Sequence, residues 1–208
     1  MIQKNAIKKE DLRARRTRKQ LLEAMITLTI QKGFRAVSVK EICEHAMINR
    51  ATFYRYYQDK YDLLDYYLEE QYKMQLAYED SGASASKPVY APDKPQEGLV
   101  RMWEHLQINA DFFRVMLGPK GEPIFTQKLR GFIEKRVRSN LPDLSGADAS
   151  LPLDLYLSYI SIASIGLIQW WLENDMPYSP HQMAVWSMKL GNADLVVALG
   201  KSVKPKKS

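Results

Sequence analysis

Cysteine is almost absent from this chain of 208 residues, in which Cys43 is the only one. One thiol excludes an intramolecular disulfide and a cysteine-rich metal site. The three histidines, His45, His105 and His181, lie far apart in the sequence and lack metal-ligand spacing. A glycine-rich phosphate loop, a nucleophile elbow and a carboxylate pair in an evident cleft are also missing. We therefore expect no enzymatic activity, no bound metal and no cofactor.

The alternation of polar and apolar residues that marks half-buried strands is missing as well, and so are internal repeats. Nearly every periodic stretch instead has helical spacing, which predicts an all-α fold. The first residues are polar and contain no apolar core of a secretory signal. Together with the shortage of cysteine, this pattern favours a cytoplasmic protein.

The positive charge is concentrated at one end of the sequence. The whole chain has 30 Lys and Arg against 24 Asp and Glu, a net charge of +6. Residues 1–60 hold 14 of the basic and 6 of the acidic residues, about +8, which leaves 16 basic and 18 acidic, about −2, in the remainder. A basic first domain on a weakly acidic body is typical of a polyanion-binding protein, with an accidental skew as the alternative.

Three short helices followed by a long one are predicted in roughly the first 80 residues. Ser38 and Glu41 have the spacing of a capping box, and Gly33 suits the position just after a helix end. Asn49 and Asp59 suit the N-caps of the next two helices. The predicted helices cover Thr17–Lys32, Val39–Ala46, Arg50–Tyr57 and Lys60 to about Glu79.

The rest of the sequence predicts four further helices and two loops. The segment 81–96 is small, polar and rich in proline, and 142–152 is similar, so both are predicted as loops. We expect a first domain over residues 1–66 and a second over 67–208. The predicted helices of the second domain cover Gln96–Leu117, Pro123–Leu141, Asp154–Asn174 and Pro180–Gly200.

The apolar stretch Leu151–Leu172 is long enough to span a membrane. It nevertheless contains Asp154, Gln169 and several serines, and it has no positive flanks. We therefore interpret it as a core or dimer helix rather than a membrane span. Its small residues give a face suited to close helix packing: Ser158, Ser161, Ala163, Ser164 and Gly166.

Two short capped helices separated by residues 47–49 have the length of a helix-turn-helix, whose second helix enters the major groove of DNA. Phe53 and Tyr57 share one face of that second helix and are expected to be buried, as is Cys43 on the first. Arginine suits guanine or phosphate, small residues suit thymine methyls, and tyrosine hydroxyls suit phosphate. The surface is left to Arg50, Ala51, Thr52, Tyr54, Arg55 and Tyr56.

The residues of this region resemble those of a known protein family. The stretches Ser38–Ile42, Ile48–Asn49, Thr52–Tyr57 and Lys60–Leu64 closely resemble the DNA-binding domain of the TetR family. The resemblance extends over about residues 13–66. It implies a repressor-like homodimer whose C-terminal domain pairs through its last two long helices and holds a small-molecule pocket.

The resemblance also assigns roles to single residues. The phosphate anchors of the family fall on Ser38, Tyr54, Tyr56 and Lys60, and its base-reading positions fall on Lys40, Asn49, Arg50, Ala51 and Thr52. The nearby arginines Arg13, Arg15, Arg16 and Arg18 suit either a solvated face or a contact with the DNA backbone or minor groove.

One position departs from the family pattern, because Met47 stands where the family has glycine in the turn. A side chain at positive φ costs roughly 1 kcal/mol. We therefore expect either that the turn relaxes or that burial of Met47 compensates.

The C-terminal half suggests an effector site and a dimer interface. The run Gly166–Pro180 is similar to the C-terminal domain of a Gram-positive branch of the family, in which one type resembles co-activators of dihydroxyacetone metabolism that respond to a protein partner. The candidate effector-pocket residues, with ordinary core as the alternative, are Trp103, Phe112, Phe113, Met116, Phe132, Tyr156 and Tyr159. The candidate interface residues are Leu167, Trp170, Trp171, Met183, Trp186 and Leu190.

The sequence thus predicts a sequence-specific transcriptional regulator that is cytoplasmic and homodimeric. We expect a repressor released from a palindromic, double-stranded DNA operator by a small-molecule effector, with a protein partner as the alternative regulator. An enzyme and a helical adaptor without DNA binding are the competing classes. The missing catalytic motifs argue against the first, and the basic first domain argues against the second.

Overall fold

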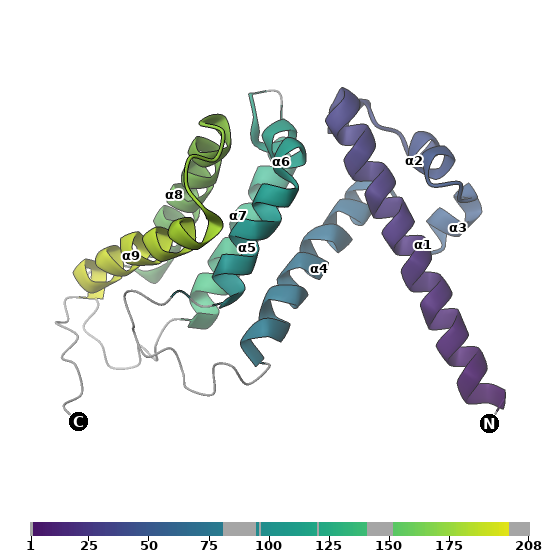
Figure 1. The fold of residues 1–208 in the computed structure, drawn as a ribbon, viewed down its shortest axis with the longest axis horizontal. Coiled ribbons are helices and arrows are strands. Elements are labelled where there is room, and N and C mark those ends of the chain that lie inside the picture. Colours follow the sequence, from purple (N-terminus) through teal and green to yellow (C-terminus); the bar gives the residue numbers. More distant parts are fainter. Residues whose placement is uncertain (1, 81–94, 96, 120, 141–151, 200–208) are drawn as a thin grey trace. The chain divides into compact units, whose positions relative to one another are not determined.

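The computed structural model describes residues 2–80, 95, 97–119, 121–140 and 152–199. Every regular element in these ranges is a helix, so the predicted all-α fold is confirmed (Figure 1). In chain order the elements are α1 (Ile2–Lys32), the short 3₁₀ helix η1 (Phe34–Ala36), α2 (Val39–His45), α3 (Arg50–Tyr54), α4 (Lys60–Asp80), α5 (Glu97–Ile108), α6 (Ala110–Leu117), α7 (Pro123–Asn140), α8 (Leu153–Glu173) and α9 (Pro180–Leu199).

Three helices differ from the sequence prediction by more than one residue. The helix predicted over Arg50–Tyr57 ends at Tyr54. The first helix begins at Ile2 rather than Thr17. The single helix expected over residues 96–117 is divided at Asn109, whose side-chain amide donates to the carbonyl of His105 at 3.0 Å. A side chain that bonds the backbone in this way competes with the helical ladder and favours an end. The loops predicted over 81–96 and 142–152 lie, apart from residues 95 and 152, outside the described residues.

The chain divides into two compact units. The first, called the head here, comprises residues 1–71 together with 111–123. The second, the C-terminal unit, comprises 72–110 and 124–208. A linear division of the sequence does not anticipate that residues 111–123, which hold most of α6, group with the head.

The head is built around apolar residues contributed by each of its helices. In α1, α2 and α3, the side chains of Met25, Ile42 and Phe53 are fully buried. The α6 segment joins the same unit through Phe112, whose ring lies 5.5 Å from that of Tyr67 in α4 and meets it edge-on. Because this core fixes α1, α2 and α3 against one another, the surface of α2 and α3 is presented rigidly.

The C-terminal unit is centred on two buried tryptophans. Trp103 of α5 and Trp171 of α8 meet edge-to-face with ring centroids 5.1 Å apart. Both indole N–H groups are used, since Trp103 donates to the Ser187 hydroxyl at 3.3 Å and Trp171 donates to the Tyr178 carbonyl at 3.0 Å. Paired aromatic rings with bonded N–H groups are a stable way to fill a core.

By length and composition alone, α8 could cross a membrane, and no other described helix could. In the structure, however, two serines of α8 make polar contacts with α7. Ser161 is fully buried and donates to the Glu134 carboxylate of α7 at 3.0 Å, and Arg130 of α7 donates to Ser158. These polar contacts favour packing within a protein core.

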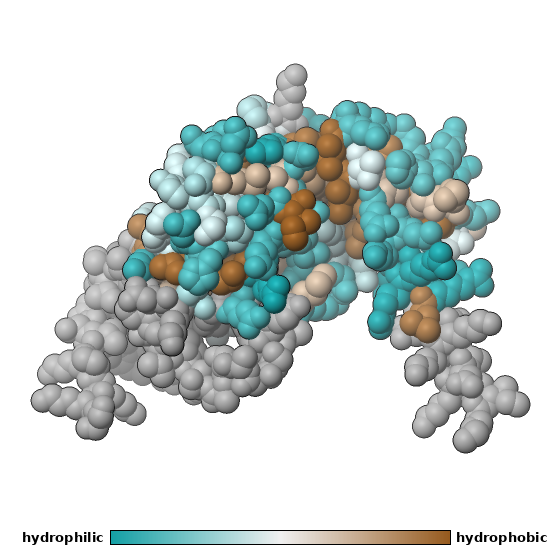
Figure 2. Space-filling view, viewed as in Figure 1, coloured by the Kyte–Doolittle hydropathy of each residue, from teal (hydrophilic) through white to brown (hydrophobic). Residues whose placement is uncertain are grey.

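Hydrophobic residues also reach the surface in the region of α9 (Figure 2).

Candidate nucleic-acid interface

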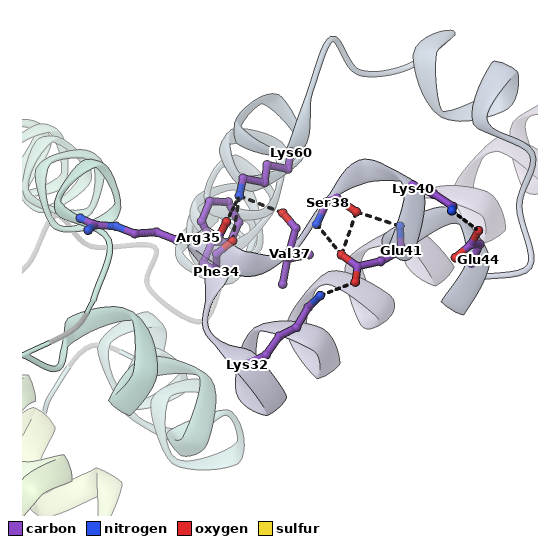
Figure 3. Close-up of polar contacts among 9 residues, drawn as sticks. All are labelled: Lys32, Phe34, Arg35, Val37, Ser38, Lys40, Glu41, Glu44 and Lys60. Carbon is purple, nitrogen blue, oxygen red and sulfur yellow. Dashed lines mark hydrogen bonds and ion pairs between the residues drawn. The ribbon is translucent and has the colours of Figure 1, made fainter.

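A network of capping hydrogen bonds begins α2 and holds Ser38 at the surface (Figure 3). The Ser38 hydroxyl accepts from the backbone N–H of Glu41 at 3.3 Å, and the Glu41 carboxylate accepts from the backbone N–H of Ser38 at 2.9 Å. Lys32 of α1 donates to the same carboxylate. The bonds from Lys32 and Ser38 lower the pKa of Glu41 to about 2. The predicted capping box is confirmed.

Asn49 begins α3, because its side-chain oxygen accepts from the backbone N–H of Ala51 at 2.8 Å. This confirms the predicted N-cap. On the inner face Phe53 is fully buried and Tyr57 nearly so, again as predicted. The outer face is left to the exposed residues Arg50, Ala51, Tyr54 and Arg55, with Thr52 and Tyr56 half-buried.

A shallow depression of about 420 Å³ lies where α2 meets α3. Its lining includes three of the predicted base-reading residues, Lys40, Asn49 and Arg50. Lys40 and Glu44 form an exposed i,i+4 ion pair at 3.8 Å (Figure 3). Such pairs are weak in water, so Lys40 remains available for an anionic partner. The other lining residues are Cys43, Glu44, Met47 and Ile48.

The turn between α2 and α3 contradicts both expectations for Met47. Its φ is +56°, so the turn keeps the left-handed conformation. The residue is 90% exposed, so burial gives no compensation. The turn is held by two backbone bonds, from Met47 N–H to the Glu44 carbonyl at 3.2 Å and from Ile48 N–H to the Cys43 carbonyl at 2.9 Å. These bonds close the end of α2 and explain why the turn does not relax.

The Lys60 side chain forms hydrogen bonds with the protein backbone (Figure 3). Its Nζ donates to the carbonyls of Phe34, Arg35 and Val37 at 2.8, 3.1 and 2.9 Å. The ammonium also lies 4.7 Å from the centre of the Phe34 ring. Burial lowers the pKa of Lys60, although Glu122 and Asp59 oppose this shift. The side chain therefore holds together the backbone of η1 and of Val37, which follows it.

Asp59 caps the start of α4, as predicted. Its carboxylate accepts from the backbone N–H groups of Tyr61 and Asp62 at 2.8 and 3.0 Å. A carboxylate at a helix N-terminus also complements the helix dipole. The cap fixes the point at which the chain leaves α3 for α4.

Tyr56, a predicted phosphate anchor, is contacted by two arginines. The guanidinium carbon of Arg18 in α1 lies 5.2 Å from the centre of the Tyr56 ring, and that of Arg55 lies 5.3 Å from it. Arg18 also lies 5.3 Å from the Tyr66 ring of α4. Cation–π contacts of this kind favour a fixed ring orientation. The sequence marked Arg18 only as one of a basic cluster, since its partners are distant in the chain.

An ion pair that the sequence did not indicate connects η1 to the residues after α6. Arg35 Nε donates to the Glu122 carboxylate at 3.2 Å, and Glu122 is only 9% exposed. The two residues are 87 positions apart, and neither belongs to a recognisable motif. Only the tertiary structure of the head brings them together.

The residues predicted to line an effector pocket fall in both units. Tyr159 differs from the others, because it is 53% exposed on α8 in the single chain. The pocket itself stays a prediction. In the C-terminal unit Trp103 and Tyr156 are buried and Phe132 is half-buried, and in the head Phe112, Phe113 and Met116 are buried.

The residues predicted for a dimer interface also divide into two groups. Trp171 and Met183 are buried within the C-terminal unit, so their side chains are not at the surface of the single chain. The others reach the surface: Trp170, Trp186 and Leu190 are exposed, and Leu167 is half-buried.

Burial explains the chemistry of two further groups in the head. Cys43 is buried, as predicted, and desolvation raises the pKa of its thiol, which favours the unreactive protonated form. The Tyr57 hydroxyl is buried without a hydrogen-bond partner, and desolvation raises its pKa as well. Neither group is suited to acid–base or nucleophilic chemistry at neutral pH.

Comparisons with known proteins agree with this geometry. Residues 21–67 match a family described as bacterial regulatory proteins, tetR family, and residues 93–190 match one described as transcriptional regulator C-terminal region. The uncharacterised HTH-type transcriptional regulator YxbF of Bacillus subtilis is 23% identical over 171 residues, covering 81% of this chain and 43% of that protein. The chain therefore spans less than half the length of this curated relative.

Solved structures share the fold. A TetR transcriptional regulator from Streptococcus agalactiae 2603V superposes with a TM-score of 0.59 at 19% identity, covering 88% of this chain and 97% of the other. DhaS, described as a dihydroxyacetone kinase operon activator, superposes with a TM-score of 0.57 at 17% identity, covering 88% and 98%. At these identities the likeness concerns the arrangement of helices.

Proposed function

The chain belongs to the TetR family of transcriptional regulators, and from this premise we propose that it is a homodimeric repressor of a palindromic operator. The observation that carries the proposal is the surface of α2 and α3. Capping bonds at Ser38 and Asn49 fix the two helices, while Lys40, Arg50 and Ala51 remain exposed beside them. Basic and small side chains on a rigid helix-turn-helix suit base edges in the major groove.

We assign base reading to Lys40, Arg50, Ala51 and Thr52 and phosphate contact to Tyr54 and Tyr56. Tyr54 is 58% exposed, and arginines fix the ring of Tyr56. Asn49 and Ser38 use their side-chain oxygens as caps. The amide N–H groups of Asn49 have further capacity to donate to DNA, whereas the Ser38 hydroxyl donates to the Glu41 carboxylate at 2.7 Å. This division gives each residue one dominant role.

An apolar stripe on α8 supports the homodimer. Leu155, Tyr159, Ile162 and Trp170 are all exposed and follow one another at helical spacing. Gly166 lies in the same row, and a Cβ placed on it meets nothing within 4 Å. An exposed apolar face of this kind marks an interaction surface, and the same face of a second copy is the occupant we propose.

The effector of the proposed repressor is a small molecule bound by the C-terminal unit, and the protein acts in the cytoplasm. The match of residues 93–190 to a regulator C-terminal region supports this assignment. Release of the repressor from its operator then requires that the effector bind the DNA-free form of the protein more tightly than the DNA-bound form.

Binding to DNA flanking the gene of this protein tests the proposal. Fluorescence anisotropy at several salt concentrations should give specific binding whose affinity falls steeply with salt, because several cations neutralise phosphates. An unrelated duplex of equal length is the control. Equal affinity for both duplexes at low salt would contradict sequence-specific regulation.

Two variants separate base reading from anchoring. Thr52→Ala should relax the preference at one base pair, while Tyr54→Phe should weaken binding to all sequences by a similar factor. The measurement is the affinity ratio between the operator and its single-base variants. Parallel losses on every sequence with both variants would contradict this division of roles.

A further inference from the structure

Met47 combines a left-handed backbone with exposure. The bonds that close α2 account for the backbone, but they do not explain why the residue is a methionine. A left-handed backbone is energetically costly for a residue that carries a side chain. Glycine would adopt the same turn without that cost. At 90% exposure, Met47 does not recover the cost by burial. Strained residues persist most often at functional sites, so the side chain itself needs a reason to be there.

The position of Met47 suggests that reason. It lines the depression of about 420 Å³ that also contains Lys40, Asn49 and Arg50. The left-handed residue therefore belongs to the surface that the proposed function directs at the major groove. Lys40 and Arg50 offer that groove charge and hydrogen bonds, which suit guanine.

The apolar feature of the major groove is the C5-methyl group of thymine. A methionine thioether is flexible and polarizable, so it fits an irregular apolar contact well. Contact would also remove the exposed side chain from water, and this gain would offset the strain in the DNA-bound state only.

We propose that Met47 is a specificity-determining residue that contacts a thymine methyl group at the edge of the half-site. The inference rests on the proposed function, because it requires that α2 and α3 face the major groove. Met47, in the turn, would thus contact bases in addition to the base-reading residues of α2 and α3.

Binding-site selection from a random-sequence duplex library tests the proposal with the full-length protein. The wild type and Met47→Leu should select the same site, including one fixed thymine. Met47→Gly and Met47→Gln should select a site that differs only by losing this thymine. Met74→Gln, which alters an exposed methionine on α4, should behave as wild type.

Replacing the selected thymine by uracil removes only its methyl group. The wild type should then bind about fourfold more weakly, the change expected for one buried methyl group. Met47→Gly and Met47→Gln should bind both duplexes equally. Thermal unfolding checks the fold, and Met47→Gly should unfold at a higher temperature because glycine relieves the strain.

Each alternative result is decisive. The proposal is overturned if Met47→Gly keeps the thymine, if uracil weakens the wild type and Met47→Gln equally, or if Met47→Gly unfolds at a lower temperature. Enrichment of no sequence by the wild type would instead defeat the proposed DNA-binding function, and this inference with it.

Discussion

At the scale of the residue, hydrogen-bond occupancy decides what a basic side chain can offer to DNA. An ammonium group has three donors, and Lys60 uses all three on backbone carbonyls within the head. Lys40 has only a long, exposed ion pair with Glu44. We infer that Lys60 positions the turn before α2 and that Lys40 faces DNA directly.

Lys60→Met should therefore lower the thermal unfolding temperature of the protein while leaving the salt dependence of DNA binding unchanged. Three backbone carbonyls, two of them in part-buried bonds, lose the Lys60 donor, whereas no phosphate loses a counter-charge. The measurement is the slope of log affinity against log salt concentration, together with the unfolding temperature.

Lys40→Met is the matched control, because it removes an exposed cation from the same surface. Its slope should fall in magnitude by up to about 0.9, the value for one neutralised phosphate, with little change in unfolding temperature. The reverse pattern, with Lys60→Met changing the slope and not the unfolding temperature, would restore Lys60 as a phosphate anchor.

His105 gives the C-terminal unit a defined dependence on pH. Burial lowers the pKa of His105 from 6.5 to about 4, and its Nδ1 lies 3.3 Å from the amide nitrogen of Asn109. Between these two pKa values the unfolded chain binds more protons than the folded one. The free energy of unfolding therefore has its maximum value above about pH 6.5. It falls by on the order of 3 kcal/mol as the pH drops toward 4.

Urea unfolding at about pH 7.5 and about pH 4.5 measures this loss. His105→Gln has no titrating group and should lose less stability over the interval than the wild type. An identical loss in the two proteins would show that other groups cause the acid sensitivity.

At the scale of the element, short helices depend on their caps because they have few internal bonds. The helix α3 spans only Arg50–Tyr54, and Asn49 satisfies one of its free N–H groups. Its stability comes from that cap and from the buried Phe53. The cap thus also determines how accurately the base-reading residues are placed.

Asn49→Ala should lower the free energy of unfolding by about 1 kcal/mol, the cost of a lost N-cap. Asn49→Ser retains a capping oxygen and should restore both stability and DNA affinity. The measurements are chemical unfolding and binding to the selected operator. A serine variant as stable as the wild type but altered in base preference would assign Asn49 a direct reading role.

At the scale of the whole molecule, α8 contributes to two surfaces at once. Its inner face holds Trp171 and Ser161 in the C-terminal unit. Its outer stripe remains apolar and exposed in the single chain. Because a dimer places two DNA-binding heads on one operator, loss of this surface should reduce DNA affinity without touching the heads.

Ile162→Asp should convert the protein from a dimer to a monomer and weaken operator binding, because two like charges would meet at a two-fold interface. Sedimentation velocity and anisotropy measure the two effects. Ile108→Asp is the control, since Ile108 is 81% exposed on α5 and lies outside the stripe. A dimeric Ile162→Asp protein would place the interface elsewhere.

The sequence by itself determined the local structure of the head. The all-α class, the capping box at Ser38, the N-cap at Asn49 and the buried Phe53 all depend on neighbours within four positions. The same applies to the helix-turn-helix and to the family resemblance that its residues carry. Short-range chemistry of this kind can be read directly from spacing.

Only the tertiary structure decided which polar and aromatic groups remain available. It brought Arg18 to Tyr56, Arg35 to Glu122 and Lys60 to the carbonyls of η1. It also buried Trp171 while leaving Tyr159 exposed on the same helix. Contacts between residues far apart in the chain depend on how helices pack, and helical periodicity alone does not specify which face meets which neighbour.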